Sequence, residues 1–449
     1  MKKFLSFVKS LTLIAIPIVI QQLFLNIASL LDTLMVGQLD EASVSGVYIA
    51  TQIIFVVNLA IFGSIEGSSV FFCQFFGKKD FVNVKKTFVF KILASTIIST
   101  LAMLIILIFG RSIVSLFIDD IVAINIAVSY LNVVAISFIP FGIVAAITSS
   151  MRESHNTVLP MLITLLGVII NFFVNYVCIF GKIGLPSLGA VGAAIGTSTE
   201  RFVELIILII FCINKKYDFC SNLLSNLKIE KKLVINMIKK SIPLLINETF
   251  WALGQTVLVY IFSQSHELAT VVLPISNTIF NLLFVVCLGI GNAVTILVGN
   301  RVGKNEFDVA QKEAYYSLIF TAAIGTILGV ILVISAPYIT GLYTAVSQEA
   351  KNMAQIIIVF YGLYLLLCAL NNSLFFILRS GGRTLLVFIF DSFYGWLFQI
   401  PLAFLILYVF NLDFIPLLII VSMLDIVKTI VGFLLVISKK WYRNLTIIN

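Results

Sequence analysis

The sequence carries little charge for its length. Only 11% of its 449 residues are Asp, Glu, Lys or Arg, and 60% are hydrophobic. Soluble domains average about 25% charged and roughly 45–50% apolar residues. A soluble core has no room for so much apolar surface, so the chain requires lipid as its solvent. This composition excludes a soluble enzyme and a soluble binding module.

Side chains for catalysis and metal binding are also scarce. The six cysteines are scattered without paired spacing, so neither a disulfide framework nor a metal cluster is indicated. The nearest approach to a phosphate-binding loop, "GNRVGKN" at 299–305, is one residue too short and has Asn where Ser or Thr would hold magnesium. No nucleophile–base constellation stands out. We therefore expect neither an enzyme nor a nucleotide-driven pump, and no cofactor.

Long apolar runs, in contrast, are abundant. An α-helical span needs about 20 mainly apolar residues, and the strict alternation of a transmembrane barrel is absent. The start of the chain lacks a convincing cleavage site, so we interpret it as part of the first span. The sequence predicts an all-α integral membrane protein with twelve transmembrane helices, at 11–36, 43–76, 87–109, 121–149, 158–180, 189–213, 234–262, 268–300, 314–336, 353–378, 385–410 and 414–437.

The basic residues gather on one side of these spans. When alternate loops are assigned to opposite sides, 24 of the 29 Lys and Arg residues fall on the side of both termini, and only Arg111, Lys182 and Lys351 fall on the other. This bias is the positive-inside pattern, so we expect both termini in the cytoplasm and the protein in the cell membrane. The net charge of +8 then serves topology and anionic lipid, not nucleic acid.

The chain contains two copies of one design. Pro17 and Pro243 are 226 residues apart, and so are Gly77 and Gly303. Six spans per copy preserve orientation, which predicts parallel, pseudo-symmetric six-helix bundles at 1–213 and 234–449, joined by a basic linker at 214–233. Such duplications typically hold a substrate cavity between the halves and favour a transporter. A static helical scaffold is the alternative.

Several segments resemble one known family. The stretches "AIPIVIQQ", "LLDTLMVGQL", "QFFGKKD", "GLPSLGAVGAAIGT", "NETFWALGQ", "LRSGGRT" and "IPLAF" look like the multidrug and toxic compound extrusion (MATE) antiporters, in order over nearly the whole chain. The resemblance implies secondary active export of organic, mainly cationic amphipathic compounds in exchange for Na⁺ or H⁺. Small organic cations or drugs and the lipid bilayer would be the partners of a monomer, without nucleotide or nucleic acid.

A lipid-linked precursor flippase of the same wider superfamily is the alternative function. Such flippases tend to carry cationic residues in the cavity, for a diphosphate headgroup. The unpaired intramembrane charges expected here, Asp32, Glu66 and Glu248, are acidic. We also expect the cations Arg201 and Lys428 to be neutralised by acids three residues away on their own helices. The sign of the charge therefore favours cationic cargo.

Asp32 is the strongest candidate for a coupling residue. A carboxylate within an apolar span is costly unless it is near water, paired or protonated. By the resemblance to MATE antiporters, Asp32 corresponds to an acid of that family's N-lobe cation site, and Asn171, Asn175 and Thr197 correspond to polar residues of the same site. Carboxylate, amide and hydroxyl oxygens suit a proton or a hard cation, so Na⁺ here is the only metal expected. The alternative is an aspartate that bonds its own backbone. Pro17 removes a helix hydrogen bond and is the expected hinge of the first span.

A second group of residues is expected to line the substrate cavity. Glu248 lies near the middle of span seven, and Gln22 is its counterpart in the repeat, 226 residues earlier. A structural glutamate is the alternative at Glu248, and close helix packing is the alternative at Glu66. The role of Asp391 stays open between a salt bridge to Arg379 or Arg383 and a part in transport. The expected cavity residues are Glu248, Glu66, Gln22, Trp251 and Asn371.

Overall fold

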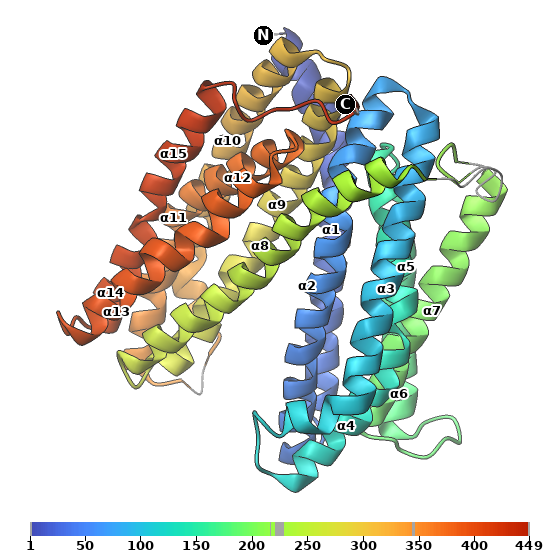
Figure 1. Ribbon diagram of the computed structural model, residues 1–449. Helices are drawn as coiled ribbons and strands as arrows, with labels where there is room; N and C mark the ends of the chain where they lie inside the picture. Colours follow the sequence, from blue (N-terminus) through green and yellow to red (C-terminus); the bar gives the residue numbers. More distant parts are fainter. Residues whose placement is uncertain (1, 216, 221–228, 344–345, 448–449) are drawn as a thin grey trace. The chain divides into compact units, whose positions relative to one another are not determined.

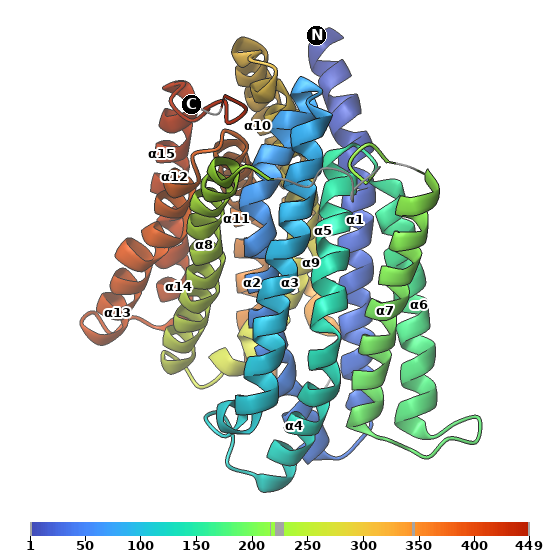
Figure 2. The ribbon, with the colours of Figure 1, turned by 45° about the vertical axis from the view of Figure 1, so that its right-hand side comes forward.

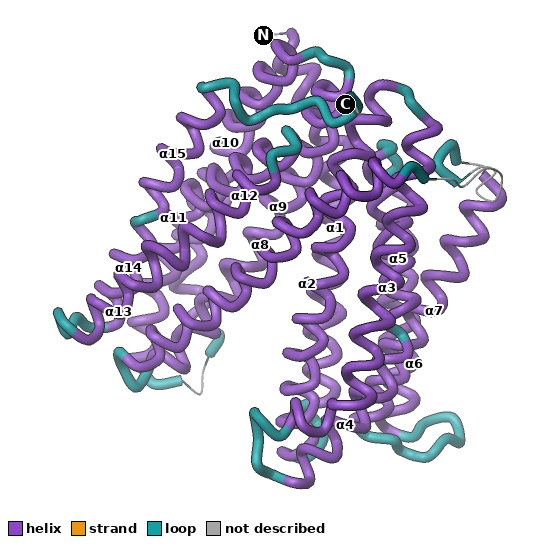
Figure 3. Tube along the Cα trace, in the orientation of Figure 1, coloured by secondary structure: helices purple, strands orange, loops and turns teal. Residues whose placement is uncertain are grey.

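The structure, a computed structural model, describes residues 2–215, 217–220, 229–343 and 346–447. Helices make up nearly all of this part of the chain (Figures 1 and 3), and an isolated bridge joins Gly382 to Tyr442. The helices are α1 (Lys2–Val36), α2 (Glu41–Lys78), α3 (Phe81–Val114), α4 (Ile121–Ile136), α5 (Phe138–Glu153), α6 (Val158–Phe180), α7 (Ala190–Lys215), α8 (Lys231–Gln264), α9 (Ala269–Gly303), α10 (Phe307–Gly341), α11 (Gln348–Ser380), α12 (Thr384–Phe388), η1 (Ile389–Phe393), η2 (Gly395–Gln399), α13 (Ile400–Tyr408), α14 (Phe414–Met423) and α15 (Asp425–Ile437).

The predicted all-α membrane fold is confirmed, with two departures from straight spans. Among the described residues, ten helical segments are long and apolar enough to cross a membrane, and the pair α4 and α5, bent by 48°, makes an eleventh. The remaining predicted span corresponds to α7, which has 26 residues and carries Glu200, Arg201 and Glu204. The second departure is a π-helical stretch between α12 and α13. Each predicted span therefore corresponds to a helical segment.

The chain divides into two units. Unit 1 contains the residues up to Val19 together with Ile246–Ile447, and unit 2 contains Ile20–Leu245. Both α1 and α8, which Figure 2 shows along their lengths, are therefore divided between the units. Each division follows two residues after the proline inside that helix, Pro17 or Pro243. The bundles expected from the repeat, 1–213 and 234–449, do not include this exchange of half-helices.

Glycines bring these half-helices into close contact inside each unit. In unit 2, a Cβ on Gly63 would lie 2.8 Å from Cα of Leu245. In unit 1, a Cβ on Gly289 would lie 2.4 Å from the side chain of Val19. Each residue of the second pair stands 226 positions from its counterpart in the first. The absence of a side chain permits the approach of the two backbones, as at many helix contacts in membranes.

The apolar cores repeat with the same spacing. The core of unit 2 contains Ile106 and Ile124, and the core of unit 1 contains Leu332 and Ala350 at positions 226 residues later. The C-terminal end of α1 contributes Met35 and Val36 to the core of unit 2, and that of α8 contributes Ile261 and Phe262 to the core of unit 1. The duplication read from the sequence is therefore also a duplication of packing.

Within each unit, loops that the charge count assigns to one side lie together. In unit 2, Nδ2 of Asn156, after α5, donates to the hydroxyl of Tyr217, after α7, at 2.8 Å. In unit 1, Nδ2 of Asn444, in the C-terminal segment, donates to Oδ1 of Asn305, between α9 and α10, at 2.6 Å. The structure thus agrees with the alternation of loops on which the predicted topology depends.

Candidate functional site

Asp32 lies in the second half of α1, within unit 2, and its carboxylate has a defined partner. Asn175 of α6 donates from Nδ2 to Oδ1 of Asp32 at 2.5 Å, and also to Oδ1 of Asn171 at 3.1 Å. Three of the four residues predicted for the coupling site therefore form one hydrogen-bonded chain. The bond of Asp32 goes to a neighbouring helix and not to its own backbone.

The helical register of α6 creates this arrangement. Asn171 and Asn175 are one turn apart and only 2% and 0% exposed, whereas Phe172 and Phe173 between them are 37% and 61% exposed. Residues four apart share a helix face, so the two amides point into unit 2 while the phenylalanines point out of it. The spacing in the sequence was sufficient to predict this pair.

Gly196 of α7 makes room for the amides. A Cβ at this position would lie 1.8 Å from Oδ1 of Asn175 and 3.3 Å from the backbone oxygen of Asn171. Any other residue would displace the amide. Thr197 follows directly; its hydroxyl donates to the carbonyl of the preceding turn at 3.2 Å, and the hydroxyl of Tyr130 on α4 lies beside it.

Two polar atoms in this group are left without partners. Oδ1 of Asn175 and Nδ2 of Asn171 are buried and have no hydrogen-bond partner among the described residues. Buried polar groups are seldom left in that state. Carboxylate, amide and hydroxyl oxygens are ligands for hard cations, and the carboxyl group also takes a proton. Because Nδ2 of Asn175 now faces Asp32, rotation of this amide would bring its free oxygen to the carboxyl group.

Two members of this site, Tyr130 and Gly196, were not predicted from the sequence. The small-residue run "GAVGAAIGTST" indicates close packing of span six, but it does not say which of its glycines faces an amide. Tyr130 carries no sequence signal because it lies in an apolar segment far from the other members. Both residues become visible only when α4, α6 and α7 are packed together.

Unit 1 contains a different group of buried charges. Lys428 forms an ion pair with Asp391 at 2.7 Å, so the predicted pairing of Lys428 with Asp425 is wrong. For Asp391, whose role was left open between a bridge to a loop arginine and a part in transport, the cationic partner is Lys428. Asp425 instead accepts from the hydroxyl of Tyr364 and from Nε2 of Gln399. The long side chain of a lysine can reach a carboxylate on a neighbouring helix as easily as a carboxylate on its own helix. Helix packing decides which of the two carboxylates becomes its partner.

The π-helical stretch explains how Asp391 reaches its partners. Residues Ile389–Phe393 and Gly395–Gln399 form wide turns, which insert extra residues into a helix and often mark functional sites. Asp391 also accepts from Nδ2 of Asn247 at 3.1 Å. Gln399, at the end of the second wide turn, reaches Asp425 at 2.9 Å.

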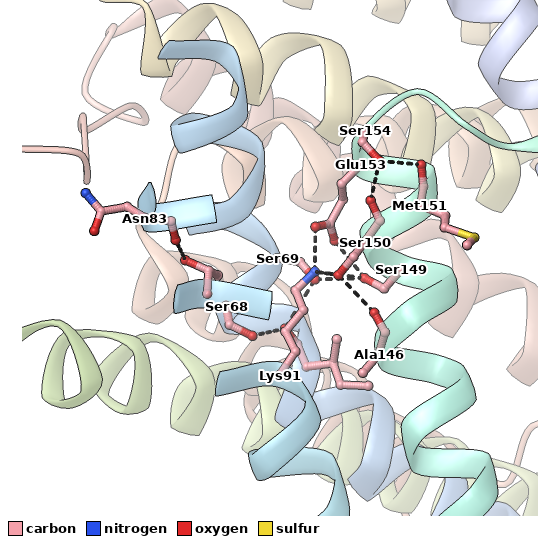
Figure 4. A network of polar contacts seen from close by, with 12 residues as sticks. Ser68, Ser69, Asn83, Lys91, Ala146, Ser149, Ser150, Met151, Glu153 and Ser154 are labelled. Atoms are coloured by element: carbon pink, nitrogen blue, oxygen red, sulfur yellow. Dashed lines mark hydrogen bonds and ion pairs between the residues drawn. The ribbon is translucent and has the colours of Figure 1, made fainter. Parts of the chain in front are cut away.

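A third polar network lies in unit 2, on α2, α3 and α5 (Figure 4). Nζ of Lys91, which is fully buried, pairs with Glu153 at 2.5 Å. Ser149 donates to the second carboxylate oxygen of Glu153 at 2.7 Å, and the ring of Phe72 lies 4.7 Å from Nζ. Lys91 lies within the span predicted at 87–109, for which no partner was predicted, and the structure shows that it is part of a paired, enclosed network.

The residues predicted for a substrate cavity are distributed between the units. Gln22 and Glu66 belong to unit 2, and the others belong to unit 1. Trp251 is 42% exposed. The side-chain amide of Asn371 instead forms hydrogen bonds within unit 1. Its Oδ1 accepts from the hydroxyl of Thr429 at 2.9 Å, and its Nδ2 donates to the backbone oxygen of Asp425 at 3.2 Å. The cavity itself stays a prediction.

Comparison with curated proteins finds relatives that match much of this chain. A protein named "Probable multidrug resistance protein NorM" from Bacillus subtilis (strain 168) is 26% identical over 344 residues, which cover 75% of each chain. A protein of the same name from Bacillus cereus is 26% identical over 415 residues, which cover 89% of this chain and 88% of the relative.

Solved structures share the fold. A crystal structure of MATE in complex with MaD3S superposes with a TM-score of 0.88 at 18% identity and covers 96% of this chain and 95% of that one. A MOP superfamily transporter from Pyrococcus furiosus superposes with a TM-score of 0.87 at 18% identity, with coverage of 96% and 95%. At this identity the likeness concerns the fold alone.

A family model described as MatE matches twice, over residues 17–177 and 243–405. The matched segments begin at Pro17 and Pro243, the two prolines that revealed the repeat. Since the model covers both halves of the duplication, the chain belongs to the MATE family and is a multi-pass membrane transporter, not an enzyme.

Proposed function

We propose that the protein is a secondary active antiporter that exports organic, mainly cationic amphipathic compounds in exchange for Na⁺ or H⁺. It acts as a monomer in the cell membrane, with both termini in the cytoplasm, and needs no cofactor beyond the transported ion. The names of its relatives, multidrug resistance proteins, support drug export. The acidic sign of the coupling candidate supports a cation as the exchanged ion.

The observation that carries this proposal is the contact between Asp32 and Asn175. A carboxylate on an apolar helix is held by one amide, at 2.5 Å, beside a buried amide oxygen that has no partner among the described residues. Binding of a proton or Na⁺ would cancel the charge and turn the Asn175 amide around. A ligand shifts a conformational equilibrium only through such differential contacts, and this site provides them.

Pro17 supplies the step that follows. It lies inside α1 and removes one backbone hydrogen bond, which weakens the helix at that point. The change of unit along α1 comes two residues later. We propose that neutralisation of Asp32 alters how the second half of α1 packs on α6, that the helix bends at Pro17, and that cargo is expelled outwards.

The test is Asp32→Asn in proteoliposomes loaded with an ethidium-like dye. We expect efflux driven by either an Na⁺ or an H⁺ gradient to be abolished, with expression and thermal stability at wild-type levels. Asp40→Asn is the matched control, because Asp40 is an acid of the same chain segment that caps α2 from the surface. Efflux by Asp32→Asn near the wild-type rate would contradict the proposal. Absence of dye movement in the wild type, together with lipid scrambling, would favour the flippase instead.

A further inference from the structure

A column of polar residues continues from the coupling site along the contact between α6 and α7. On α6 the buried residues Thr164 and Gly167 lie two turns and one turn before Asn171. On α7 Glu200 and Glu204 follow Gly196 at intervals of four residues. Residues at such spacing share one helix face. The two polar faces meet each other, and the column extends away from Asp32.

Contacts across the two helices fix the glutamates in this column. A Cβ on Gly167 would lie 3.1 Å from Oε1 of Glu204 and 3.2 Å from Cγ of Glu200. Both side chains therefore lie against the same glycine of α6. The side chain of Thr164 lies beside the carboxylate of Glu204.

The column reaches the opposite end of unit 2 through two further hydrogen bonds. Nε2 of Gln21, on α1, donates to the hydroxyl of Thr164 at 2.8 Å. The guanidinium of Arg152, in the last turn of α5, donates to Oε1 of Gln21 at 2.6 Å. Arg152 lies next to the turn whose Asn156 contacts Tyr217, in the group of loops that the charge count assigns to the cytoplasm. Polar groups thus run from Asp32 to that end of the unit.

The charges along the column do not cancel. Glu200, Arg201 and Glu204 sum to a net charge of −1 when all are ionised. Arg201 lies near both glutamates, but its guanidinium donates to Ser137 at 3.1 Å and lies 4.5 Å from the ring of Phe141. Uncompensated carboxylates inside a membrane are expensive, and chains of them are typical of proton relays. A purely structural pair, as sequence analysis predicted for Arg201 and Glu204, needs only one of the two glutamates.

We infer that Glu200 and Glu204 form an internal proton path between Asp32 and the Arg152 end of unit 2, and hence that the coupling ion is H⁺. The inference depends on the antiport proposed above. A proton leaves the carboxyl group of Asp32 for the carboxylate of Glu200, passes to the carboxylate of Glu204, and is released from there to water at the Arg152 end of the unit. Thr164 and Gln21 orient Glu204 and do not carry the proton. Each step breaks one O–H bond and forms another. Arg152 compensates the negative charge that the exit region gains when the proton departs.

The acidic and basic groups that face this path come from four helices. They are Asp32 of α1, Tyr130 of α4, Arg152 of α5, and Glu200, Arg201 and Glu204 of α7. Asn171 and Asn175 separate Asp32 from Glu200 in the present arrangement. A side-chain amide does not relay a proton, so transfer from Asp32 to Glu200 requires the change in packing of α1 on α6 proposed above, which brings the two carboxyl groups together. This requirement prevents the path from conducting protons without transport.

The experiment measures proton movement and cargo separately, in proteoliposomes with a pH-sensitive dye in the lumen and ethidium as cargo. We expect the double variant Glu200→Gln, Glu204→Gln to lose at least tenfold of its cargo-coupled proton flux while its affinity for ethidium, measured in detergent, changes by less than twofold. Glu230→Gln is the charge-matched control, because that side chain is 64% exposed in its pair with Lys86. The control should keep both activities.

Thr164→Val is the second variant, in case the double variant does not fold. It removes the hydroxyl that links Glu204 to Gln21 without altering charge or volume greatly, and we expect a proton flux reduced severalfold at unchanged ethidium affinity. Wild-type proton flux in a folded double variant, or in Thr164→Val when the double variant does not fold, would overturn the path. If Asp32→Asn is inactive while these variants are normal, the antiport proposal stands and only the path is wrong. If the wild type moves ethidium without protons, H⁺ coupling is wrong.

Discussion

Asp391 and Asp425 of unit 1 and Asp32 of unit 2 all lie among polar neighbours, but their carboxylates are hydrogen-bonded to different extents. In unit 1 each of the four carboxylate oxygens of Asp391 and Asp425 accepts a hydrogen bond or ion pair. The donors are Lys428, Asn247, Gln399 and Tyr364. In unit 2 the hydrogen bond of Asp32 comes from Asn175, whose own oxygen is left without a partner among the described residues.

We expect the closed network of unit 1 to be structural, whereas the partly satisfied group around Asp32 is the one that we propose binds an ion. A fully satisfied polar network stabilises one arrangement, since every change leaves a buried group unpaired. A partly satisfied one gains when a proton or cation arrives, and so responds to a gradient. The two halves of the duplicated chain therefore have similar helices, but Asp391 and Asp425 are more fully hydrogen-bonded than Asp32.

The largest effect on stability is expected when one partner of the Lys428–Asp391 ion pair of unit 1 is removed. Lys428→Gln leaves Asp391 buried without its cation, and loss of one partner of such a pair costs about 3–5 kcal/mol. The double variant with Asp391→Asn should recover much of that loss, because no uncompensated charge remains. Unfolding in detergent measures both. A cost below about 1 kcal/mol for the single variant would show that the pair is dispensable.

A substitution beside Asp32 and Asn175 in unit 2 should instead reduce transport activity more than it reduces the stability of the protein. Gly196→Ala places a methyl group where Oδ1 of Asn175 lies, 1.8 Å away, so the amide can no longer turn towards Asp32. We expect gradient-driven dye efflux to fall at least tenfold. Gly341→Ala is the control, because no atom lies within 4 Å of the added carbon. Equal efflux by both variants would remove Asn175 from the mechanism.

Glu248→Gln tests whether the acid of α8 recognises cargo charge. If Glu248 contacts cationic cargo, its neutralisation should weaken binding of a cationic dye about tenfold, or ~1.4 kcal/mol, and leave a neutral compound of similar size unchanged. Proton carriage would impair both cargoes alike. Binding at several pH values distinguishes these outcomes, and wild-type binding and transport of both cargoes would make Glu248 structural.

The smallest effect concerns Asp40, a few residues after Asp32 but at the surface. The backbone N–H of Ser43 lowers the pKa of Asp40 from its usual value, since the carboxylate caps the first turn of α2. A lowered pKa adds stability above the ordinary value near 4, and this stability is lost as pH falls through the folded value. Asp40→Asn should flatten this part of the thermal stability profile between pH 5 and 3. An unchanged profile would mean that the cap contributes nothing measurable.

Much of the fold and part of the candidate site could be predicted from local sequence patterns. Hydrophobic length identifies spans because a bilayer demands a fixed thickness of apolar helix. The spacing of Asn171 and Asn175 identifies a shared face because the helix repeats every 3.6 residues. The acid at Asp32 was visible because it interrupts such a span. The constant offset of 226 predicted the duplication, which the cores and glycine contacts repeat.

Contacts between helices could not be predicted, because partner choice depends on how the helices pack. Sequence alone paired Lys428 with its neighbour Asp425, whereas the wide turns of the eleventh span bring Asp391 to it. It predicted no partner for Lys91, whereas Ser149 and Glu153 of α5 bind its buried ammonium group. By itself the sequence determined the lipid environment, the spans, the repeat and the acid on the first helix, all of which follow from local composition and periodicity. Only the tertiary structure decided which half of α1 joins which unit, which charges are paired and which amide oxygen remains free, since these depend on residues far apart in the chain.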